Sequence, residues 1–152
     1  MRIMFVCHGN ICRSPMAEMI FKNMLAERGL AEGFTVASSA TSTEEIYRGV
    51  GNPIYPPAVR ELRRHGIPVE NRRAIRLTPE DYEKYDLFLL MDERNRRGIA
   101  SIFPSDPERK VKKLLDYAGG GDVADPWYSG DFEAAYSDIY RGCLGLLNAI
   151  CG

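Results

Sequence analysis

The apolar positions of the chain form short continuous runs that alternate with stretches of helical period. Residues 3–6 and 87–91 are apolar at every position, which indicates buried strands, the second of them covered on both faces. Residues 34–38 and 110–115 are predicted to form two further strands, the last one more peripheral. Strands that alternate with helices indicate a parallel, doubly wound sheet with right-handed crossovers. The sequence therefore predicts an α/β fold in which helices flank a four-stranded parallel sheet.

Helical period follows the first strand and returns several times. Apolar residues at helical spacing predict a first helix that ends near Gly29, with Ser14 and Pro15 suited to the N-cap and the first helical position. Further helices are predicted over residues 57–65, after Thr78 as N-cap and over residues 93–103. The last helix has the most regular apolar face, formed by Phe132, Ala135, Tyr136, Ile139, Cys143, Leu146, Leu147 and Ile150.

Length and composition restrict the classes of function. The 152 residues are predicted to form one domain, residues 1–152, without repeats or linkers. Twenty basic and 21 acidic residues give a net charge of −1, so the overall charge favours neither nucleic acid nor a membrane surface as a partner. No signal peptide and no apolar run of about 18 residues is present, so we expect a cytoplasmic protein. The cysteines do not resemble a disulfide framework, which agrees with a reducing compartment: Cys7, Cys12, Cys143 and Cys151.

The segment between the first strand and the first helix carries the most specific motif of the chain. It consists of Cys7, His8, Gly9, Asn10, Ile11, Cys12, Arg13 and Ser14. The backbone N–H groups of such a turn and the dipole of the following helix favour an oxyanion. Gly9 and Asn10 tolerate the positive φ that a loop around an anion needs. These residues are therefore predicted to form a phosphate-binding loop.

Three side chains of this loop can supply chemistry. We expect Cys7 to be a thiolate at neutral pH, because thiols that face the N-terminus of a helix ionise readily. Arg13 presents a planar fork that can bind two oxygens of a phosphoryl group. The Ser14 hydroxyl can donate a hydrogen bond to the thiolate and help Cys7 to leave in a second step. The loop therefore predicts nucleophilic attack on a phosphate ester.

Expulsion of an alkoxide or phenolate from such an ester needs a proton donor. Asp125 is the candidate, because it follows a glycine run and precedes Pro126, which restricts it to extended backbone. Trp127 and Tyr128 come next and are expected to be exposed in a loop, where they could sandwich a phenyl ring. A carboxylic acid in this role contributes about 10²–10⁴-fold to the rate.

The loop motif together with Asp125-Pro126-Trp127-Tyr128 resembles the low-molecular-weight protein tyrosine phosphatases. The likeness extends through residues 36–39, 77–81, 91–93 and 132–136 and covers nearly the whole chain. It implies a phosphatase I-like fold and hydrolysis of phosphotyrosine proteins or small aryl phosphates through a cysteinyl phosphate. By the resemblance, Cys7 is the nucleophile, Arg13 the phosphate clamp, and Asp125 first the general acid and then the general base.

The chain departs from the family pattern in two places. Residues 39–57 are predicted to be a long loop, where family members often carry a Trp-His pair and this chain has Glu45-Ile46-Tyr47. Tyr47 is expected to supply the wall of the site opposite Trp127 and Tyr128. A histidine that supports the loop in the family is replaced by Arg72, and the sequence does not show what takes over its hydrogen bond.

Three other functions share part of this pattern. Protein-arginine phosphatases have a smaller polar residue at the position of Ile11, and Ile11 suits an aryl rim better than a guanidinium. Arsenate reductases of the same fold need further cysteines, but Cys143 and Cys151 lie on or after the last helix. A catalytically silent phosphopeptide-binding module would not need the complete set of Cys7, Arg13 and Asp125. Tyrosine phosphatase activity is therefore the preferred interpretation.

The remaining expectations concern cofactors, partners and redox chemistry. No metal or cofactor is expected, because the histidines and cysteines lack the spacing of a ligand set. The protein is expected to be a monomer or weak dimer. Under peroxide, a Cys7–Cys12 disulfide could protect the nucleophile, or Cys12 could simply be a small loop residue. Arg94, Arg96 and Arg97 are expected to form a solvent-exposed helix face.

Overall fold

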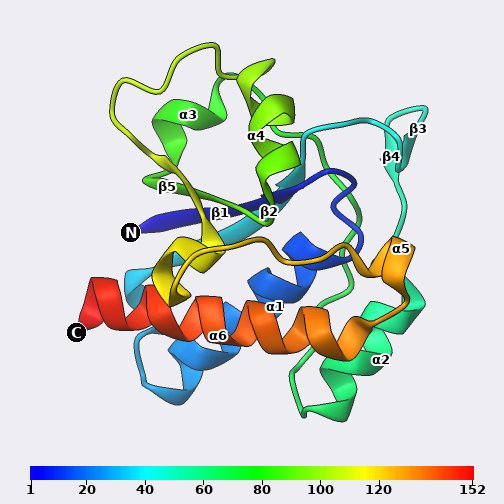
Figure 1. Cartoon of the computed structure of the whole chain (residues 1–152), viewed down its shortest axis with the longest axis vertical. Coiled ribbons are helices and arrows are strands. Elements are labelled where there is room, and N and C mark those ends of the chain that lie inside the picture. Colours follow the sequence, from blue (N-terminus) through cyan, green and yellow to red (C-terminus); the bar gives the residue numbers. More distant parts are fainter.

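The computed structural model describes all residues from 1 to 152, and a parallel sheet with the strand order β2-β1-β5-β6 runs through its centre (Figure 1). The strands are β1 (Arg2–Cys7), β2 (Thr35–Ala40), β5 (Leu87–Leu90) and β6 (Val111–Lys113). All three neighbouring pairs are parallel, which confirms the predicted fold class. Because the connection after β1 leads to β2 on one side and the later crossover leads to β5 on the other, the switch point of the sheet lies at the carboxyl ends of β1 and β5. Open α/β sheets bind ligands at such a switch point.

Helices cover both faces of this sheet (Figure 1). The α-helices are α1 (Arg13–Glu27), α2 (Pro56–Arg64), α3 (Asp81–Lys84), α4 (Glu93–Ala100), α5 (Pro126–Ser129) and α6 (Phe132–Cys151). Short 3-10 helices span Ala31–Gly33 and Leu114–Ala118, and a small hairpin consists of β3 (Ile46–Tyr47) and β4 (Val50–Gly51). No helix combines the length and the apolar character that a membrane crossing needs.

Alternation along the central strands divides the core into two layers. Ile3 and Phe5 of β1 point into the larger cluster, which packs against α1, α2 and α6. Met4 and Val6 point to the opposite face, where Phe88 and the residues around α3 and α4 cover them. Since both faces of β1 and β5 are buried, their sequences are continuously apolar rather than alternating. This packing holds the carboxyl end of β1 in a fixed position.

Several predicted boundaries are wrong for identifiable reasons. The N-cap of α1 is Cys12 rather than Ser14, because the Ser14 hydroxyl bonds within the loop instead. Residues 39–57 contain the β3–β4 hairpin and the start of α2. Thr78 precedes a turn, and α3 begins only at Asp81 with Glu80 as its N-cap. The segment after Asp125 is a short helix that Asp125 itself caps, so Trp127 and Tyr128 lie on α5.

Candidate active site

The loop from Cys7 to Ser14 joins the carboxyl end of β1 to the first turn of α1 and is largely buried. Asn10 has a φ of 60°, as the predicted anion-binding turn requires. Gly9 does not adopt positive φ, so the expectation for this residue is wrong. A Cβ at position 9 would instead lie 3.2 Å from Cγ of Glu45. Glycine therefore suits this position because the Glu45 side chain approaches the backbone closely. The loop therefore needs one left-handed residue.

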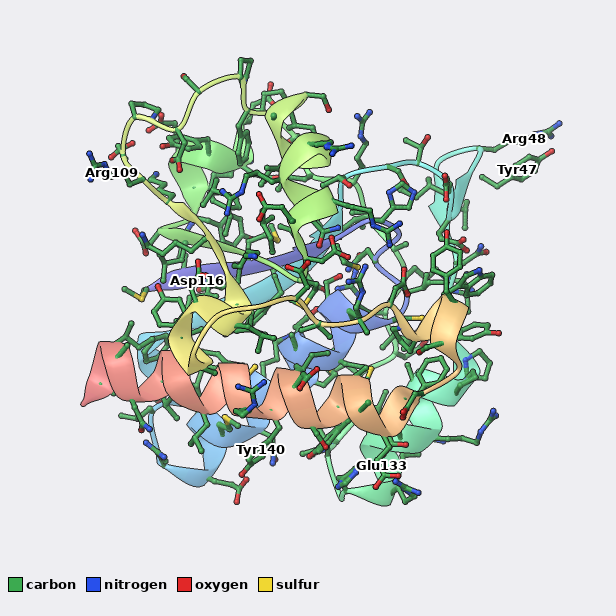
Figure 2. The ribbon with its side chains drawn as sticks, viewed as in Figure 1. Tyr47, Arg48, Arg109, Asp116, Glu133 and Tyr140 are labelled. Atoms are coloured by element: carbon green, nitrogen blue, oxygen red, sulfur yellow. The ribbon has the colours of Figure 1, made fainter.

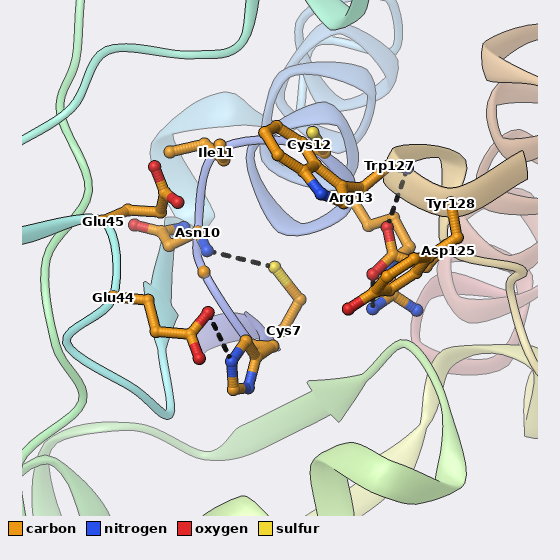
Figure 3. A pocket seen from close by; sticks show the side chains of 12 residues that line it. Cys7, Asn10, Ile11, Cys12, Arg13, Glu44, Glu45, Asp125, Trp127 and Tyr128 are labelled. Carbon is orange, nitrogen blue, oxygen red and sulfur yellow. Dashed lines mark hydrogen bonds and ion pairs between the residues drawn. The ribbon is translucent and has the colours of Figure 1, made fainter. Parts of the chain in front are cut away.

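The sulfur of Cys7 lies among hydrogen-bond donors (Figure 3). The backbone N–H of Asn10 donates to Sγ over 3.3 Å, and Oγ of Ser14 lies 3.0 Å from Sγ. Ser14 Oγ accepts a hydrogen bond from Nδ2 of Asn10 at 2.8 Å, so its own proton is available for the sulfur. The structure thus places Ser14 beside the sulfur, as the sequence predicted, and adds the backbone N–H of Asn10 as a second donor.

The guanidinium of Arg13 is buried and held from two sides. Its Nη1 donates to Oδ2 of Asp92 at 2.6 Å and to the carbonyl of Val123 at 2.8 Å. Its Nη2 lies 3.4 Å from Oδ2 of Asp125. Burial alone would lower the pKa of Arg13, but the negative charges of Cys7 and Asp92 outweigh it, so the pKa is raised and the group stays charged. Arg13 therefore has a fixed orientation beside Cys7.

Asp92 is a site residue that sequence reasoning missed. It is the N-cap of α4, where its Oδ1 accepts from the backbone N–H of Asn95 at 3.0 Å, while its other oxygen binds Arg13. One carboxylate thus anchors a helix and orients the guanidinium of Arg13. The available signal was a Met-Asp-Glu sequence directly after a buried strand, which lies at the same edge of the sheet as the loop.

Arg72, which stands where the resemblance implies a histidine, reaches the loop from below. Its Nη2 donates to Oδ1 of Asn10 at 2.6 Å, and its Nη1 bonds Glu18 Oε1 at 2.5 Å and the side chain of Ser38. Asn10 Oδ1 also accepts from the backbone N–H of Ile75 at 3.1 Å. The open question about this replacement is thereby answered, because the guanidinium itself reaches the asparagine.

Glu18 and Ser38 complete this support and were not identified from the sequence. Glu18 is 5% exposed on α1 and accepts from Ser38 Oγ at 2.6 Å and from Lys22 Nζ at 2.7 Å. Ser38 Oγ also accepts from Nδ2 of Asn10 at 3.0 Å. The buried carboxylate is therefore paired with two cations, as burial of a charge requires. An acidic residue beside the apolar face of the first helix was the only sequence signal.

Asp125 faces the loop from the other side of the pocket. Its Oδ1 accepts from the backbone N–H of Trp127 at 3.0 Å, which caps α5, and its Oδ2 is the oxygen near Arg13. Trp127 and Tyr128 are 53% and 77% exposed at the rim of the same pocket as Cys7. The ring centroid of Trp127 lies 4.9 Å from that of Tyr55. The structure thus brings the acid candidate and both aromatic residues to the mouth of the site.

Tyr47 lies outside the pocket. It belongs to β3, is 73% exposed and carries Arg48 over its ring at 5.4 Å, and Figure 2 shows both side chains extending from the hairpin into solvent. Glu44 and Glu45 line the wall opposite Trp127 and Tyr128 instead (Figure 3). The sequence prediction placed Tyr47 in this wall because it could not resolve the hairpin that carries it outward.

Three further loop residues show graded exposure. Ile11 is buried against Cys12 and Ala74, and both Ile11 and Cys12 line the pocket. Burial, followed by the charge of Cys7, raises the pKa of Cys12 to about 12, so its thiol is protonated at neutral pH. His8 is exposed, and its Nε2 lies 3.0 Å from Oε2 of Glu44. Seven of the eight loop residues therefore line one pocket, and Ser14 lies outside its lining but next to the sulfur of Cys7.

Comparison with known proteins gives a consistent result. The family model described as low molecular weight phosphotyrosine protein phosphatase matches residues 2–151. The low molecular weight protein-tyrosine-phosphatase YfkJ of Bacillus subtilis is 38% identical over 97% of this chain and 94% of its own. The human low molecular weight phosphotyrosine protein phosphatase is 35% identical over 95% of this chain and 92% of its own.

Solved structures agree with these matches. The crystal structure of YfkJ from Bacillus subtilis covers 99% of this chain and 94% of its own, with a TM-score of 0.91 and 35% identity. A Drosophila arginine phosphatase covers 100% of this chain and 99% of its own, with a TM-score of 0.86 and 28% identity. This fold therefore occurs both in proteins named tyrosine phosphatases and in a protein named an arginine phosphatase.

Proposed function

This chain belongs to the low molecular weight phosphotyrosine protein phosphatase family, and from that premise we propose that it hydrolyses phosphotyrosine and small aryl phosphates through a cysteinyl-phosphate intermediate. One observation carries the proposal: Cys7, Arg13 and Asp125 line a single pocket. The sulfur has hydrogen-bond donors, the guanidinium is held rigidly beside it, and the carboxyl group faces both. Nucleophile, clamp and proton donor are thus available to one phosphate ester.

The first step transfers the phosphoryl group to sulfur. Cys7 Sγ attacks phosphorus, the S–P bond forms, the bond from phosphorus to the aryl oxygen breaks, and Asp125 gives its proton to that oxygen. Charge on the three equatorial oxygens is met by the loop amides and by Arg13. Because Asp92 and the Val123 carbonyl already orient Arg13, little reorganisation is needed in the transition state.

The second step returns the enzyme to its starting form. Asp125, now a carboxylate, takes a proton from water, the water oxygen attacks phosphorus, and the P–S bond breaks to release inorganic phosphate. The leaving sulfur regains its contacts with the Asn10 N–H and the Ser14 hydroxyl. These donors stabilise negative charge on sulfur, so we propose that Asn10 and Ser14 assist departure as well as attack.

The aromatic rim favours an aryl substrate. Trp127 and Tyr128 stand beside Asp125, and Ile11 adds an apolar surface at the edge of the loop. Planar apolar groups bind a phenyl ring better than the flexible, strongly hydrated side chain of phosphoserine or phosphoarginine. For Tyr47 we propose only a contact with the protein substrate outside the pocket, in keeping with its exposed position.

The proposal is tested by turnover of three phosphopeptides of otherwise identical sequence, carrying phosphotyrosine, phosphoserine or phosphoarginine, at several pH values. We expect kcat/KM to be at least about 100-fold higher for phosphotyrosine than for phosphoserine, because only the former leaves as a stabilised phenolate and fills the aromatic rim. Preferential hydrolysis of phosphoarginine would establish the arginine phosphatase alternative. Binding without turnover of any peptide would indicate a silent recognition module.

We further propose that Cys7 and Cys12 form a protective disulfide under peroxide. Peroxide oxidises the Cys7 thiolate to a sulfenic acid, and the Cys12 sulfur then attacks Cys7 sulfur, forming the S–S bond and releasing water. The raised pKa of Cys12 keeps its thiol protonated and makes Cys7 the first target. Activity of the peroxide-treated enzyme should return with dithiothreitol, and a Cys12→Ser variant should lose this recovery. Equal recovery of both proteins would show that Cys12 is only a packing residue.

Location and assembly complete the proposal. We propose that the protein acts in the cytoplasm as a monomer or weak dimer and without a metal or cofactor, since the two-step chemistry is complete with its own side chains. Cell fractionation tests the location. Sedimentation at several protein concentrations tests the assembly, and a stable dimer at the lowest concentration would contradict it.

A further inference from the structure

A second cavity adjoins the phosphate pocket on the side of the proton donor. It shares His8, Arg13, Asp125 and Tyr128 with the pocket that contains Cys7. The start of α4 adds Arg94 and its neighbours to the lining. Asp125 and Tyr128 line both cavities, so the second cavity lies directly beside the phosphate site.

Arg94 is the only charged residue of this second cavity without an ionic partner. The other ionisable groups that face the cavity have partners: Arg13 lies 2.6 Å from Asp92 and 3.4 Å from Asp125, and His8 Nε2 lies 3.0 Å from Glu44. Arg94 is exposed, and its Cζ lies 5.9 Å from the ring centroid of Tyr128. That distance is at the outer limit of a cation–π contact, so the guanidinium keeps its hydrogen-bonding capacity.

Local stability does not explain an arginine at this position. Arg94 is the second residue of α4, and a cation near the N-terminus of a helix is disfavoured by the helix dipole. Its neighbour Arg96 differs, since its Nε pairs with Glu93 at 2.9 Å on the helix surface. The predicted solvent-exposed arginine face is confirmed for Arg94, Arg96 and Arg97, but only Arg94 also lines the second cavity.

The opposite rim of the phosphate pocket carries the reverse charge. Glu44 and Glu45 line the wall across from Asp125 and Tyr128 (Figure 3). Glu45 is fixed there by Asn52, whose Nδ2 donates to its Oε1 at 2.9 Å. The mouth of the site is thus acidic at the hairpin side and has an unpaired cation at the α4 side. Complementary charge across an interface sets the orientation of a bound partner.

We propose that the cavity at Arg94 is a subsite for an acidic side chain of the protein substrate, close to the phosphorylated tyrosine. The carboxylate binds the Arg94 guanidinium beside Tyr128, and the two glutamates disfavour the reversed orientation. This inference rests on the proposed function and concerns only the choice among phosphotyrosine substrates. It assigns to Arg94 a role in specificity and none in the bond-breaking steps.

The experiment compares phosphotyrosine peptides that carry glutamate, glutamine or lysine at one flanking position. Each position from three before to three after the tyrosine is varied in turn. For the unaltered protein, at one or more positions, kcat/KM should be about three- to tenfold higher for glutamate than for glutamine, as expected for a partly exposed ion pair. With Arg94→Glu this ratio should fall to one or below, and lysine should become the preferred residue there.

Arg97→Glu is the matched control, because it makes the same charge change on the same exposed helix outside the cavity. It should leave the glutamate-to-glutamine ratio within about twofold of the unaltered protein. Equal effects of both variants, or an Arg94→Glu protein with an unchanged ratio, would overturn the subsite. Failure of the unaltered protein to hydrolyse even the glutamine peptide would instead contradict the proposed function. Arg94→Gln, which should give an intermediate ratio, guards against misfolding of the charge reversal.

Discussion

The two sides of the active site differ in how they are held. On the phosphate side, Asn10 and Arg13 are 1% and 2% exposed, and their side-chain groups bind Ser38 of β2, Asp92 at the N-cap of α4, and Arg72. On the proton-donor side, Trp127 and Tyr128 are largely exposed, and the short helix α5 is capped only by Asp125. One half of the site is part of the core, and the other is part of the surface.

The buried side and the exposed side have different roles in catalysis. The phosphoryl group has the same shape and charge in every substrate, so fixed donors stabilise its transition state without reorganisation. The rest of the substrate varies and must enter and leave, so the side that meets it is open. Substitutions on the buried side should therefore affect every substrate alike, and those on the exposed side should discriminate among substrates.

The strongest test of this division is Cys7→Ser. Replacement of the sulfur removes the nucleophile, so kcat should fall by roughly 10⁴-fold or more for all substrates. The amides and Arg13 remain, so inorganic phosphate should still bind, which isothermal titration calorimetry measures. Cys143→Ser is the control, since Cys143 is buried in the core far along α6. Turnover by Cys7→Ser near the normal rate would refute the cysteinyl-phosphate route.

Asp125→Asn should have the next largest effect and should depend on the leaving group. The amide keeps the capping hydrogen bond to Trp127 but cannot give up a proton, so kcat/KM should fall by about 10²–10⁴-fold for phosphotyrosine. Aryl phosphates with acidic phenols need less help and should lose far less. A series of substituted phenyl phosphates measures this slope. Parallel losses across the series would remove Asp125 from the role of proton donor.

The buried side was the easier one to predict in outline. Its reacting groups lie within eight consecutive residues between an apolar strand and a helix, so a local pattern contains Cys7, Arg13 and Ser14 together. The strand at residues 87–91 was equally visible, because burial on both faces leaves a continuous apolar run. Features that depend on residues close together in the sequence could therefore be predicted from the sequence alone.

The hydrogen-bond partners of these loop residues could not be predicted, because they are distant in the sequence and only the folded topology brings them together. Asp92 is 79 residues from Arg13, and Arg72 is 62 residues from Asn10. The assignment of Ser14 as N-cap failed for a local reason, since Cys7 and Asn10 within the loop take up its hydroxyl. On the exposed side, no packing constraint marks the hairpin, so Tyr47 was placed in a wall that two glutamates form.

The support below the loop is tested by Arg72→Ala. Removal of this guanidinium leaves Glu18 with a single cation and Asn10 Oδ1 without a charged donor. Breaking a buried pair costs about 3–5 kcal/mol, and partial exposure of Arg72 should reduce the loss to about 2 kcal/mol of unfolding free energy. Urea unfolding measures this, and kcat/KM should fall by about tenfold for phosphotyrosine and small aryl phosphates alike. Arg76→Ala, an exposed neighbour, should change neither.

Arg72→His sharpens the same prediction through pH. A guanidinium stays charged throughout the working range, whereas an imidazole paired with Glu18 has a folded-state pKa above its unfolded value. The stability that the pair contributes is then fully present below the unfolded pKa and is lost as the pH rises through the folded pKa. The variant should therefore lose stability from about pH 6.5 upward relative to the unaltered protein. A constant difference across pH would show that the charge of residue 72 is not what supports Asn10.

The smallest effect is expected for Trp127→Ala on the exposed side. Its ring packs on Tyr55 and lines the pocket, so its loss removes contact area for a substrate ring but no group that meets the phosphate. An aromatic pair contributes about 0.5–1.5 kcal/mol, so KM for aryl phosphates should rise about three- to tenfold while kcat changes little. Tyr140→Ala, at an exposed aromatic residue of α6 outside the pocket, is the control. If kcat/KM falls as much for alkyl phosphates as for aryl phosphates, Trp127 supports the loop rather than the substrate. The division between a fixed side and a selective side would then not hold at this residue.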